Sequence, residues 1–364
     1  MVAEKTEKRK SEHIRICLEK KAQAKTVTAG FEDVKFVHRA LPEINCEDIN
    51  LSTSFLKKTF AAPLIVGAMT GGTEEAVEIN RNIAMAVERL GLGMGLGSQR
   101  AAIENFTLEK TFSVARKAAP NAFLVANIGG VQLVHGYGVQ EVRKIVEMID
   151  ADAVAIHLNA LQEAVQPEGQ TSFKGVLAKI GEVAGKIDQP VIVKETGAGI
   201  SAEDAEALKN VGVAAIDVGG VGGTSFAAVE YYRGEKVLGE VFWDWGIPTA
   251  VSVVEVVQST KLPVIASGGV RTGLDIAKAL TLGANLASIT QPVLEAAVKC
   301  SEDTERLLLG LINELRNVLF LVGAKNVAGL VNVPLVICNE TAEWLKMRGF
   351  NLEEYALRGG VPNS

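Results

Sequence analysis

Residues 263–289 read PVIASGGVRTGLDIAKALTLGANLASI and predict one complete unit of an alternating α/β fold. The apolar run Val264–Ala266 has the length of a buried strand, and 273–282 has the apolar spacing of a helix. Gly283 is the kind of residue that ends a helix, and a second apolar run, Leu286–Ile289, follows it. Strand, helix and strand in this order form the repeat of parallel sheets.

The same pattern recurs along the chain from residue 61. Eight runs have strand length, namely Leu64–Ala68, Gly93–Leu96, Phe123–Asn127, Ala153–Leu158, Val191–Lys194, Ala214–Val218, Val264–Ala266 and Leu286–Ile289. Helices are predicted at about 75–90, 104–118, 138–149, 173–186, 202–210, 249–258, 273–282 and 302–322. Eight such units favour a TIM (β/α)8 barrel. An open doubly wound sheet remains the alternative, because glycine-capped helices occur there too.

Two regions fall outside the eight repeats. We expect an N-terminal extension at 1–60 that contributes to a substrate site, a ligand-binding barrel at 61–325 and a C-terminal tail at 326–364. The stretch 219–247 is an insertion after the sixth strand. Loops after the strands build the functional face of a barrel, so this insertion is expected to be a lid or a substrate wall. A packing excursion or an oligomer contact is the alternative.

Composition excludes several classes of protein. The 364 residues are 48% hydrophobic with a net charge of −6, which argues against a nucleic-acid surface. The four cysteines have no CxxC spacing, so neither a zinc site nor a disulfide framework is indicated. No apolar run reaches the roughly 18 residues of a membrane span, and the charged start has no signal core. We expect a cytoplasmic protein that does not bind membranes.

Three distant segments suggest a phosphorylated ligand. Ser267–Gly273 lies between a strand and a helix, where free backbone N–H groups attract an anion. The second segment lies near the N-terminus and contains the cations Arg9 and Lys10. The third, Gly97–Arg100, contains the cation Arg100. Each segment is weak alone, since glycines after a strand are often only a tight turn. Their recurrence in one predicted barrel strengthens the interpretation.

Polar residues also follow nearly every predicted strand, and a barrel brings them to one mouth. They are Thr70, Ser98, Arg100, Asn127, His157, Asn159, Gln162, Glu163, Lys194, Glu195, Asp217, Thr224, Ser225, Ser267, Arg271 and Ser288. A phosphate held by the last two loops, with a ring spanning the mouth, suggests flavin mononucleotide (FMN). A cation such as Lys194 would stabilise negative charge on a reduced flavin, although a Schiff-base lysine is the competing role.

These residues carry a resemblance to the type 2, FMN-dependent isopentenyl-diphosphate isomerase family over nearly the whole length. The matching motifs are Arg9-Lys10 with Glu12-His13, Ala68–Gly72, Gly97–Arg100, Asn127, His157–Asn159 with Leu161–Glu163, Gln166–Gly169, Lys194-Glu195, Gly222–Ser225, Trp245–Thr249 and Ser267–Thr272. Their order and spacing together are specific. One departure is Phe226, where the family pattern has tryptophan.

The resemblance implies a role for individual residues. It places the flavin on Ala68, Met69, Thr70, Ser98, Asn127, Lys194 and Thr224, with its phosphate on Gly269, Val270, Arg271, Ala287 and Ser288. It places the substrate on Arg9, Lys10, Ser98, Gln99, Arg100 and Gln162, and Mg²⁺ on Glu163. Gln162, His157 and Lys194 are the implied catalytic residues. Cationic side chains suit a diphosphate, and a carboxylate suits Mg²⁺.

The implied reaction shifts a double bond and converts isopentenyl diphosphate to dimethylallyl diphosphate in isoprenoid biosynthesis. The resemblance also implies reduced FMN as the acid-base agent, NAD(P)H as a reductant, and a homo-oligomer, either a tetramer or an octamer. An FMN-dependent 2-hydroxy acid oxidoreductase is the alternative activity, but region 214–264 lacks the histidine base that it needs. A flavin or phosphate carrier without catalysis is a third class, and it would not require Glu163.

The four histidines differ in what the sequence says about them. His157 ends a strand at the mouth and is the better functional candidate, while His13 shares a helical face with Arg9 or belongs to a solvated basic helix. His38 and His135 have no predicted role. The polar N-terminal arm is expected to fold over the mouth when a diphosphate binds, either on its own subunit or on a neighbouring one.

Overall fold

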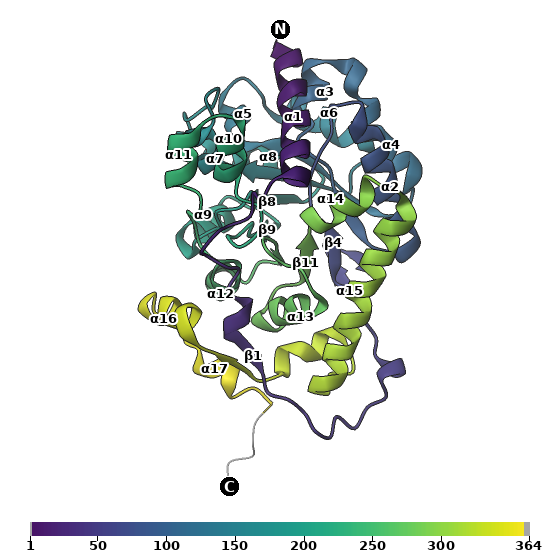
Figure 1. The fold of residues 1–364 in the computed structure, drawn as a ribbon, viewed down its shortest axis with the longest axis vertical. Coiled ribbons are helices and arrows are strands. Elements are labelled where there is room, and N and C mark those ends of the chain that lie inside the picture. The colour runs from purple at the N-terminus through teal and green to yellow at the C-terminus, as the bar shows by residue number, and fades with distance from the viewer. Residues whose placement is uncertain (1, 360–364) are drawn as a thin grey trace.

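Eight parallel strands close into a barrel in the computed structural model, which describes residues 2–359, with side chains from residue 7 onward (Figure 1). They are β4 (Leu64–Val66), β5 (Gly93–Gly95), β6 (Phe123–Gly129), β7 (Ala153–Leu158), β8 (Val191–Glu195), β9 (Ala215–Asp217), β10 (Val264–Ala266) and β11 (Leu286–Ile289). The barrel closes where β11 pairs with β4. The predicted TIM barrel is confirmed.

Amphipathic helices surround the strands. They are α2 (Glu75–Leu90), α4 (Lys110–Ala118), α6 (Val139–Ile149), α8 (Val176–Ala184), α9 (Ala202–Asn210), α12 (Thr249–Thr260), α13 (Gly273–Leu282) and α15 (Ser301–Val322). The helix predicted at 104–118 is wrong in extent. Asn105 leaves the helical conformation and its side chain accepts from the N–H of Thr107, so α3 (Arg100–Glu104) and η3 (Phe106–Leu108) precede α4.

The barrel interior is apolar over most of its height. Alternate strand residues point inward, and the buried cluster they form contains Ile65, Phe123, Val125, Ala153, Ala155, Ile192, Ala215, Ile265 and Leu286. A hairpin of β2 (Thr53–Phe55) and β3 (Lys58–Phe60) joins this cluster through Phe55 and Phe60, whose rings contact Phe123. The hairpin therefore plugs the amino end of the barrel, and only the carboxyl end is open for a ligand.

The extension and the tail pack against each other at the end of the molecule away from α1 (Figure 1). β1 (Val34–Phe36) pairs antiparallel with β12 (Leu335–Ile337), and buried Asp33 in η1 (Phe31–Asp33) accepts from Asn339 and Thr341. The remaining elements there are η2 (Cys46–Asp48), η4 (Val327–Asn332), α16 (Asn339–Met347) and α17 (Glu353–Ala356). The three-part division of the chain stays a prediction.

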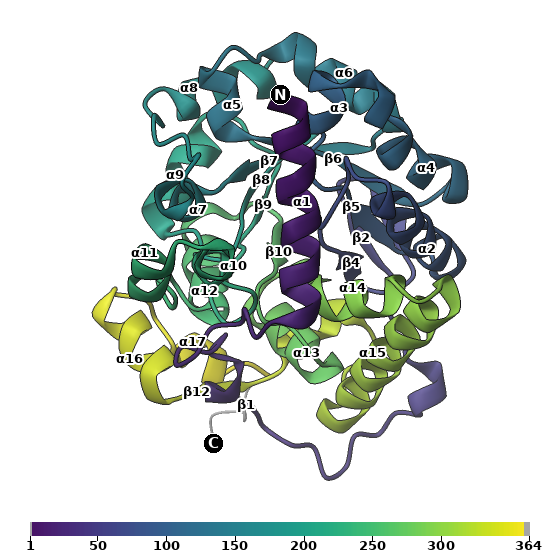
Figure 2. The ribbon, with the colours of Figure 1, turned by 45° about the horizontal axis from the view of Figure 1, so that its top comes forward.

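One N-terminal helix, α1 (Val2–Glu19), lies across the open end of the barrel (Figure 2). The insertion after the sixth strand folds into α10 (Phe226–Arg233) and α11 (Lys236–Val241), and α1 packs on α10. Ile16 shares a buried apolar cluster with Ala228, Val229 and Trp243. Burial of this face holds a polar helix over the mouth.

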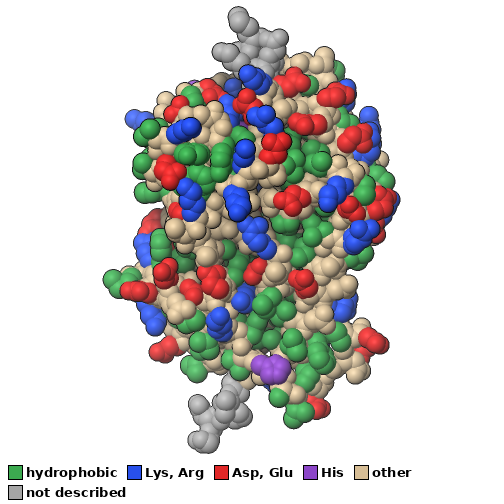
Figure 3. All heavy atoms as spheres, in the orientation of Figure 1, with side chains coloured by type: hydrophobic (Ala, Val, Ile, Leu, Met, Phe, Trp, Pro, Cys, Tyr) green, Lys and Arg blue, Asp and Glu red, His purple; other side chains and the backbone are tan. Residues whose placement is uncertain are grey.

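The surface shows no face of single charge in the view of Figure 3, where acidic and basic side chains are interspersed. Within residues 2–359, no helix combines the length and the apolarity that crossing a bilayer requires. Three short helices directly follow barrel strands. They are α5 (Gly130–Val134) after β6, α7 (Ala160–Val165) after β7 and α14 (Gln291–Ala297) after β11.

Candidate active site

A cavity of about 1760 Å³, counted to its opening, lies at the carboxyl end of the barrel. α1 covers it, and the loops after the strands form its walls. Seventeen of the residues expected in the site line it, namely Arg9, Lys10, Ala68, Met69, Thr70, Ser98, Arg100, Asn127, His157, Gln162, Glu163, Lys194, Thr224, Gly269, Val270, Arg271 and Ser288.

Two expected residues are not part of this lining. Gln99 is fully buried, where its Nε2 donates to the carbonyl of Ile145 at 2.9 Å and its Oε1 accepts from the N–H of Asn127 at 3.0 Å. Ala287 alternates with the inward-facing Ser288, so its side chain points toward the outer helices. The side chain of Gln99 therefore holds the backbone of β6 and not a substrate, and the side chain of Ala287 belongs to the core. A contact of the Ala287 backbone with a phosphate stays a prediction.

The floor of the cavity is the uppermost inward-facing layer of the barrel. On six strands, the residue two positions after the last apolar inward-facing residue belongs to this layer. These residues are Asn127, His157, Lys194, Asp217, Ser267 and Ser288, and all except Asp217 line the cavity. The strand register places His157 next to Lys194, and Lys194 next to Asp217. A polar layer thus sits on apolar layers, because the last inward position of each strand faces the mouth instead of the core.

A glycine-rich wall follows β9 and β10. Gly268 and Gly269 have φ values of +100° and +70°, and a Cβ on Gly223 would lie 2.6 Å from the nitrogen of Gly269. These two loops can therefore approach each other and a ligand only as glycines. The anion site expected at the start of α13 needs a correction, because Asp275 accepts the N–H groups of Arg271 and Thr272. The Arg271 side chain and the glycine backbone remain to meet a phosphate.

Two buried hydroxyls in the cavity have no hydrogen-bond partner. They are Oγ1 of Thr70, in the loop after β4, and Oγ of Ser288, in the neighbouring strand β11. A buried polar group without a partner is costly, so such groups indicate a missing ligand. Together with the glycine wall, they fit a polar ring and a phosphate, as FMN carries.

Lys194 lies in the floor between His157 and Asp217. Its Nζ donates to the carbonyl of Glu195 at 2.7 Å, and the carboxylate of Asp217 lies on the neighbouring strand. Burial raises the pKa of Asp217, whereas Lys194 and the Ser267 hydroxyl oppose that rise. Burial also raises the pKa of Glu195 to about 7, although backbone N–H groups of Thr196 and Gly197 bind its carboxylate.

His157 is held in one orientation. Nδ2 of Asn127 donates to the carbonyl of Leu96 at 2.9 Å, so Oδ1 of Asn127 is the acceptor that faces Nδ1 of His157 at 2.8 Å. Nδ1 therefore carries the proton, and Nε2 is left as an acceptor. Burial, followed by the charges of Lys194 and Lys10, lowers the pKa of His157 to about 3. The ring is neutral at physiological pH.

A basic wall faces the mouth from α1 and α3. Nζ of Lys10 donates to the carbonyls of Gly71 and Ser98, the latter at 2.7 Å. Burial first, and then the charge of Arg9, lowers the pKa of Lys10 to about 7. Arg100 lies in the same wall and binds Glu104 at 2.6 Å. Close cations that destabilise one another make a site for an anion.

A group of amides and one carboxylate lies opposite this wall on α7. Nδ2 of Asn159 donates to Glu163 at 2.9 Å and to Gln162 at 3.1 Å, and the N–H of Gln170 donates to Glu163 at 2.7 Å. No cluster of three or more metal-ligating side chains occurs among residues 2–359. Glu163 alone fits Mg²⁺ only if substrate oxygens and water complete the shell, which is the usual arrangement for this ion.

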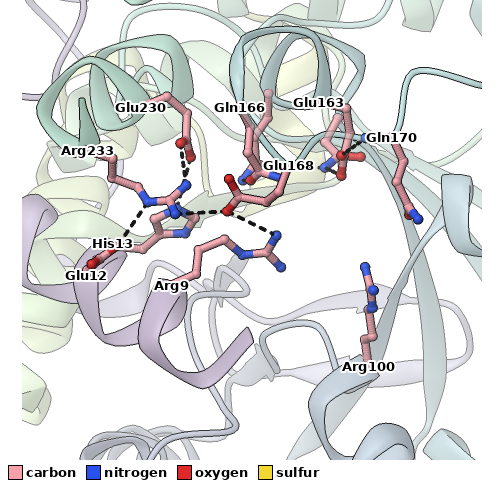
Figure 4. Close-up of polar contacts among 12 residues, drawn as sticks. Arg9, Glu12, His13, Arg100, Glu163, Gln166, Glu168, Gln170, Glu230 and Arg233 are labelled. Atoms are coloured by element: carbon pink, nitrogen blue, oxygen red, sulfur yellow. Dashed lines mark hydrogen bonds and ion pairs between the residues drawn. The ribbon is translucent and has the colours of Figure 1, made fainter. Parts of the chain in front are cut away.

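The structure also brings together charged residues whose mutual contacts the sequence analysis did not predict. Figure 4 shows Arg233 among Glu12, Glu168 and Glu230, next to Arg9 and His13. Glu230 is fully buried and lies 3.0 Å from Nε2 of His13. The spacing of Glu230 and Arg233 on a helix was the local sequence signal, since the partners on α1 are more than 200 residues away and Glu168 is 65 residues away. Phe226 lines the cavity and meets His13 edge-on.

The closed barrel, its glycine-rich wall and its polar floor define the class of the protein: a barrel enzyme with a site that can take a flavin. The profile of the FMN-dependent dehydrogenase family matches residues 140–335. Among solved structures, mandelate oxidase aligns with a TM-score of 0.62 at 18% identity, covering 93% of this chain and 99% of that one. A flavocytochrome b2 variant aligns with a TM-score of 0.66 at 18% identity, over 97% and 86% of the two chains. At these identities the likeness shows the fold.

Closer relatives carry one name. The isopentenyl-diphosphate delta-isomerase of Methanosarcina barkeri is 49% identical over 97% of this chain and 98% of its own length. That of Pyrococcus furiosus is 50% identical over 95% and 90%. The chain belongs to the isopentenyl-diphosphate delta-isomerase family, and the resemblance noted from its motifs is confirmed.

Proposed function

We propose that the protein isomerises isopentenyl diphosphate to dimethylallyl diphosphate, with reduced FMN and Mg²⁺ bound. The observation that carries the proposal is the joint placement of a basic wall, the Glu163 carboxylate and a flavin-compatible floor in a single cavity. Each part matches one component of the reaction: the diphosphate, the metal ion and the cofactor.

The residues that would bind FMN surround the unpartnered hydroxyls of Thr70 and Ser288 and the glycine-rich wall. Thr70, Ser98, Asn127, Lys194 and Thr224 would surround the ring, with Ala68 and Met69 beside it. Gly269, Val270, Arg271 and Ser288 would hold the phosphate. Reduced FMN supplies an acid-base group and electron density for a substrate that no side chain is acidic enough to protonate.

The substrate residues lie above that floor. Arg9, Lys10 and Arg100 bring positive charge to a diphosphate, and the Ser98 hydroxyl adds a donor. Glu163 would hold Mg²⁺, with the diphosphate oxygens as further ligands. Asn159 and the N–H of Gln170 fix the two carboxylate oxygens of Glu163 in place.

In this arrangement the alkene of the substrate would lie between the basic wall and the floor. Gln162 is oriented by Asn159 and would face the five-carbon chain. Neutral His157 offers the lone pair of Nε2 to the cavity and cannot act as an acid near neutral pH. Lys194 balances negative charge at the floor. These side chains orient the substrate and exclude water while a proton is added at one carbon and removed at another.

The family resemblance supports three further parts of the proposal. NAD(P)H would reduce the flavin, the protein would work as a homo-oligomer of four or eight chains, and it would act in the cytoplasm. The hydroxy-acid oxidoreductase alternative has weaker support. Within the described residues, the cavity histidines His13 and His157 come from α1 and β7, and neither comes from a late loop with an adjacent arginine.

Removal of the metal ligand tests the proposal. The holoprotein is reduced anaerobically and assayed with isopentenyl diphosphate at limiting Mg²⁺. Glu163→Gln should lower turnover by roughly 100-fold or more, since even outer-shell changes cost 10- to 100-fold, while flavin content stays the same. Glu182→Gln, on the outer face of α8, is the matched control. Unchanged turnover in Glu163→Gln would refute the role of Glu163 as the metal ligand, and the absence of turnover in the wild-type protein would favour a carrier.

A further inference from the structure

One guanidinium gathers three carboxylates from three separate segments at the rim of the cavity. Arg233 of α10 donates to Glu12 of α1 at 3.1 Å, to Glu168 after α7 at 2.9 Å, and to Glu230 at 2.5 Å (Figure 4). Its side chain is 14% exposed. We call Arg233 and these three carboxylates the rim cluster.

The rim cluster fastens α1 in two ways. Glu12 binds Arg233 directly, while His13 lies 3.0 Å from Glu230, which Arg233 also binds. Residues 9, 12 and 13 lie on one face of a helix, so these contacts share a side with Arg9. The apolar contact of Ile16 with α10 lies one turn further along.

Glu168 connects the rim cluster with Arg9 of the basic wall. Its Oε1 accepts from Nη2 of Arg233 at 2.9 Å and lies 4.0 Å from Nη1 of Arg9. Two cations thus share one carboxylate oxygen, and the shorter contact is with Arg233. The pKa of Glu168 is lowered against the effect of burial, with the hydrogen bond from Arg233 as the larger favourable cause and Arg9 as a smaller one.

The charge balance indicates what Arg233 does for Arg9. Without Arg233, the carboxylates of Glu12, Glu168 and Glu230 would lose their shared partner. Glu168 would then draw the guanidinium of Arg9 away from an incoming anion. We propose that Arg233 is a positioning residue, which occupies Glu168, closes α1 over the mouth and so leaves the charge of Arg9 available to the diphosphate. This inference rests on the proposed function, because it assumes that the ligand above the floor is an anionic diphosphate.

A double-mutant cycle in the FMN-loaded full-length protein tests this role. Arg233→Met should weaken inorganic pyrophosphate binding and raise KM for isopentenyl diphosphate at least tenfold, with kcat within about twofold and flavin content unchanged. Adding Glu168→Gln should recover most of that loss, because it removes the competitor for Arg9. Arg306→Met, which breaks an exposed pair with Asp303, is the matched control.

Several outcomes separate this role from a structural one. No recovery by Glu168→Gln, or an equal loss of kcat and flavin, would overturn the positioning role. If Arg233→Met does not fold, Arg233→Lys keeps one positive charge but loses the fork that reaches three carboxylates, and it should show the same KM effect in smaller measure. Tryptic cleavage at Arg9 and Lys10 reports whether α1 stays closed over the mouth. If Arg233→Lys keeps both an unchanged KM and slow cleavage at these residues, the positioning role is also overturned.

The same data distinguish this inference from the proposed function. If wild-type protein binds pyrophosphate but does not isomerise the alkene, the proposed function fails while the pyrophosphate cycle still tests Arg233. If wild-type protein turns over normally and the cycle shows no coupling between positions 233 and 168, only the positioning role fails.

Discussion

Nδ1 of His157 lies 2.8 Å from Oδ1 of Asn127, and this contact fixes which side of the imidazole faces the cavity. The amide of Asn127 cannot flip without losing its bond to Leu96. The proton therefore stays on Nδ1, and the Nε2 lone pair is presented to a ligand on the floor. His157 therefore presents an acceptor to the cavity.

His157 is predicted to stay neutral from about pH 5 to 8, because burial and the charges of Lys194 and Lys10 hold its pKa at about 3. Nitrogen chemical shifts of ¹⁵N-histidine-labelled protein measure this directly, with the exposed His38 as a second signal in the same spectrum. A titration of the His157 ring in the middle of that range would contradict the assigned role.

Anion binding is predicted to weaken as pH rises through 7. The pKa of Lys10 is lowered to about 7, so the side chain is charged below that pH and becomes neutral above it. A diphosphate binds the charged form, and the advantage of wild type over Lys10→Met in pyrophosphate affinity should shrink toward none by about pH 9. Taking the ratio of the two dissociation constants cancels the ionisation of pyrophosphate itself. A ratio that does not change with pH would disprove the prediction.

FMN affinity is predicted to depend on the two partnerless hydroxyls in the cavity. Thr70→Ala and Ser288→Ala should each weaken FMN binding by roughly tenfold, which corresponds to one lost hydrogen bond of about 1.4 kcal/mol. Fluorescence titration of the apoprotein gives the dissociation constants. Thr73→Ala removes another buried hydroxyl without a partner, but one outside the cavity lining, and serves as the control. Equal effects at all three positions would mean that the loss reflects packing.

Deletion of residues 1–12 is predicted to raise KM for the substrate at least tenfold and to leave flavin content intact. The deletion removes Arg9 and Lys10 from the wall, whereas the expected flavin contacts all lie on the barrel. Steady-state kinetics and the flavin absorbance of the purified protein measure the two effects. Normal kinetics in the shortened protein would show that α1 is not part of the substrate site.

Much of the barrel could be predicted because its strands carry local signals. Runs such as Val264–Ala266 are apolar throughout, and the glycines that follow them are needed for close backbone approach. The position of Ala287 was also accessible: if Ser288 points inward, a period of two sends Ala287 outward. The alternation excludes only a side-chain contact of Ala287 with the ligand, and a contact through its backbone stays a prediction.

Other parts of the site have no local signal. Arg233 meets Glu12 across 221 positions, and a basic or acidic residue on an exposed helix face gives no indication of such a partner. Gln99 reads as a polar loop residue, yet it is buried because its amide satisfies the backbone of two neighbouring segments. The break of the predicted helix at Asn105 depends on a side-chain cap that helix periodicity does not reveal.

The most direct test of the central claim compares the two redox states of the bound flavin. FMN-loaded protein with Mg²⁺ is incubated with isopentenyl diphosphate anaerobically, once with oxidised and once with dithionite-reduced flavin, and proton NMR follows the alkene signals. The account predicts dimethylallyl diphosphate only with reduced flavin, and none from apoprotein with dithionite. Equal conversion in both redox states, or no conversion with reduced flavin, would contradict it.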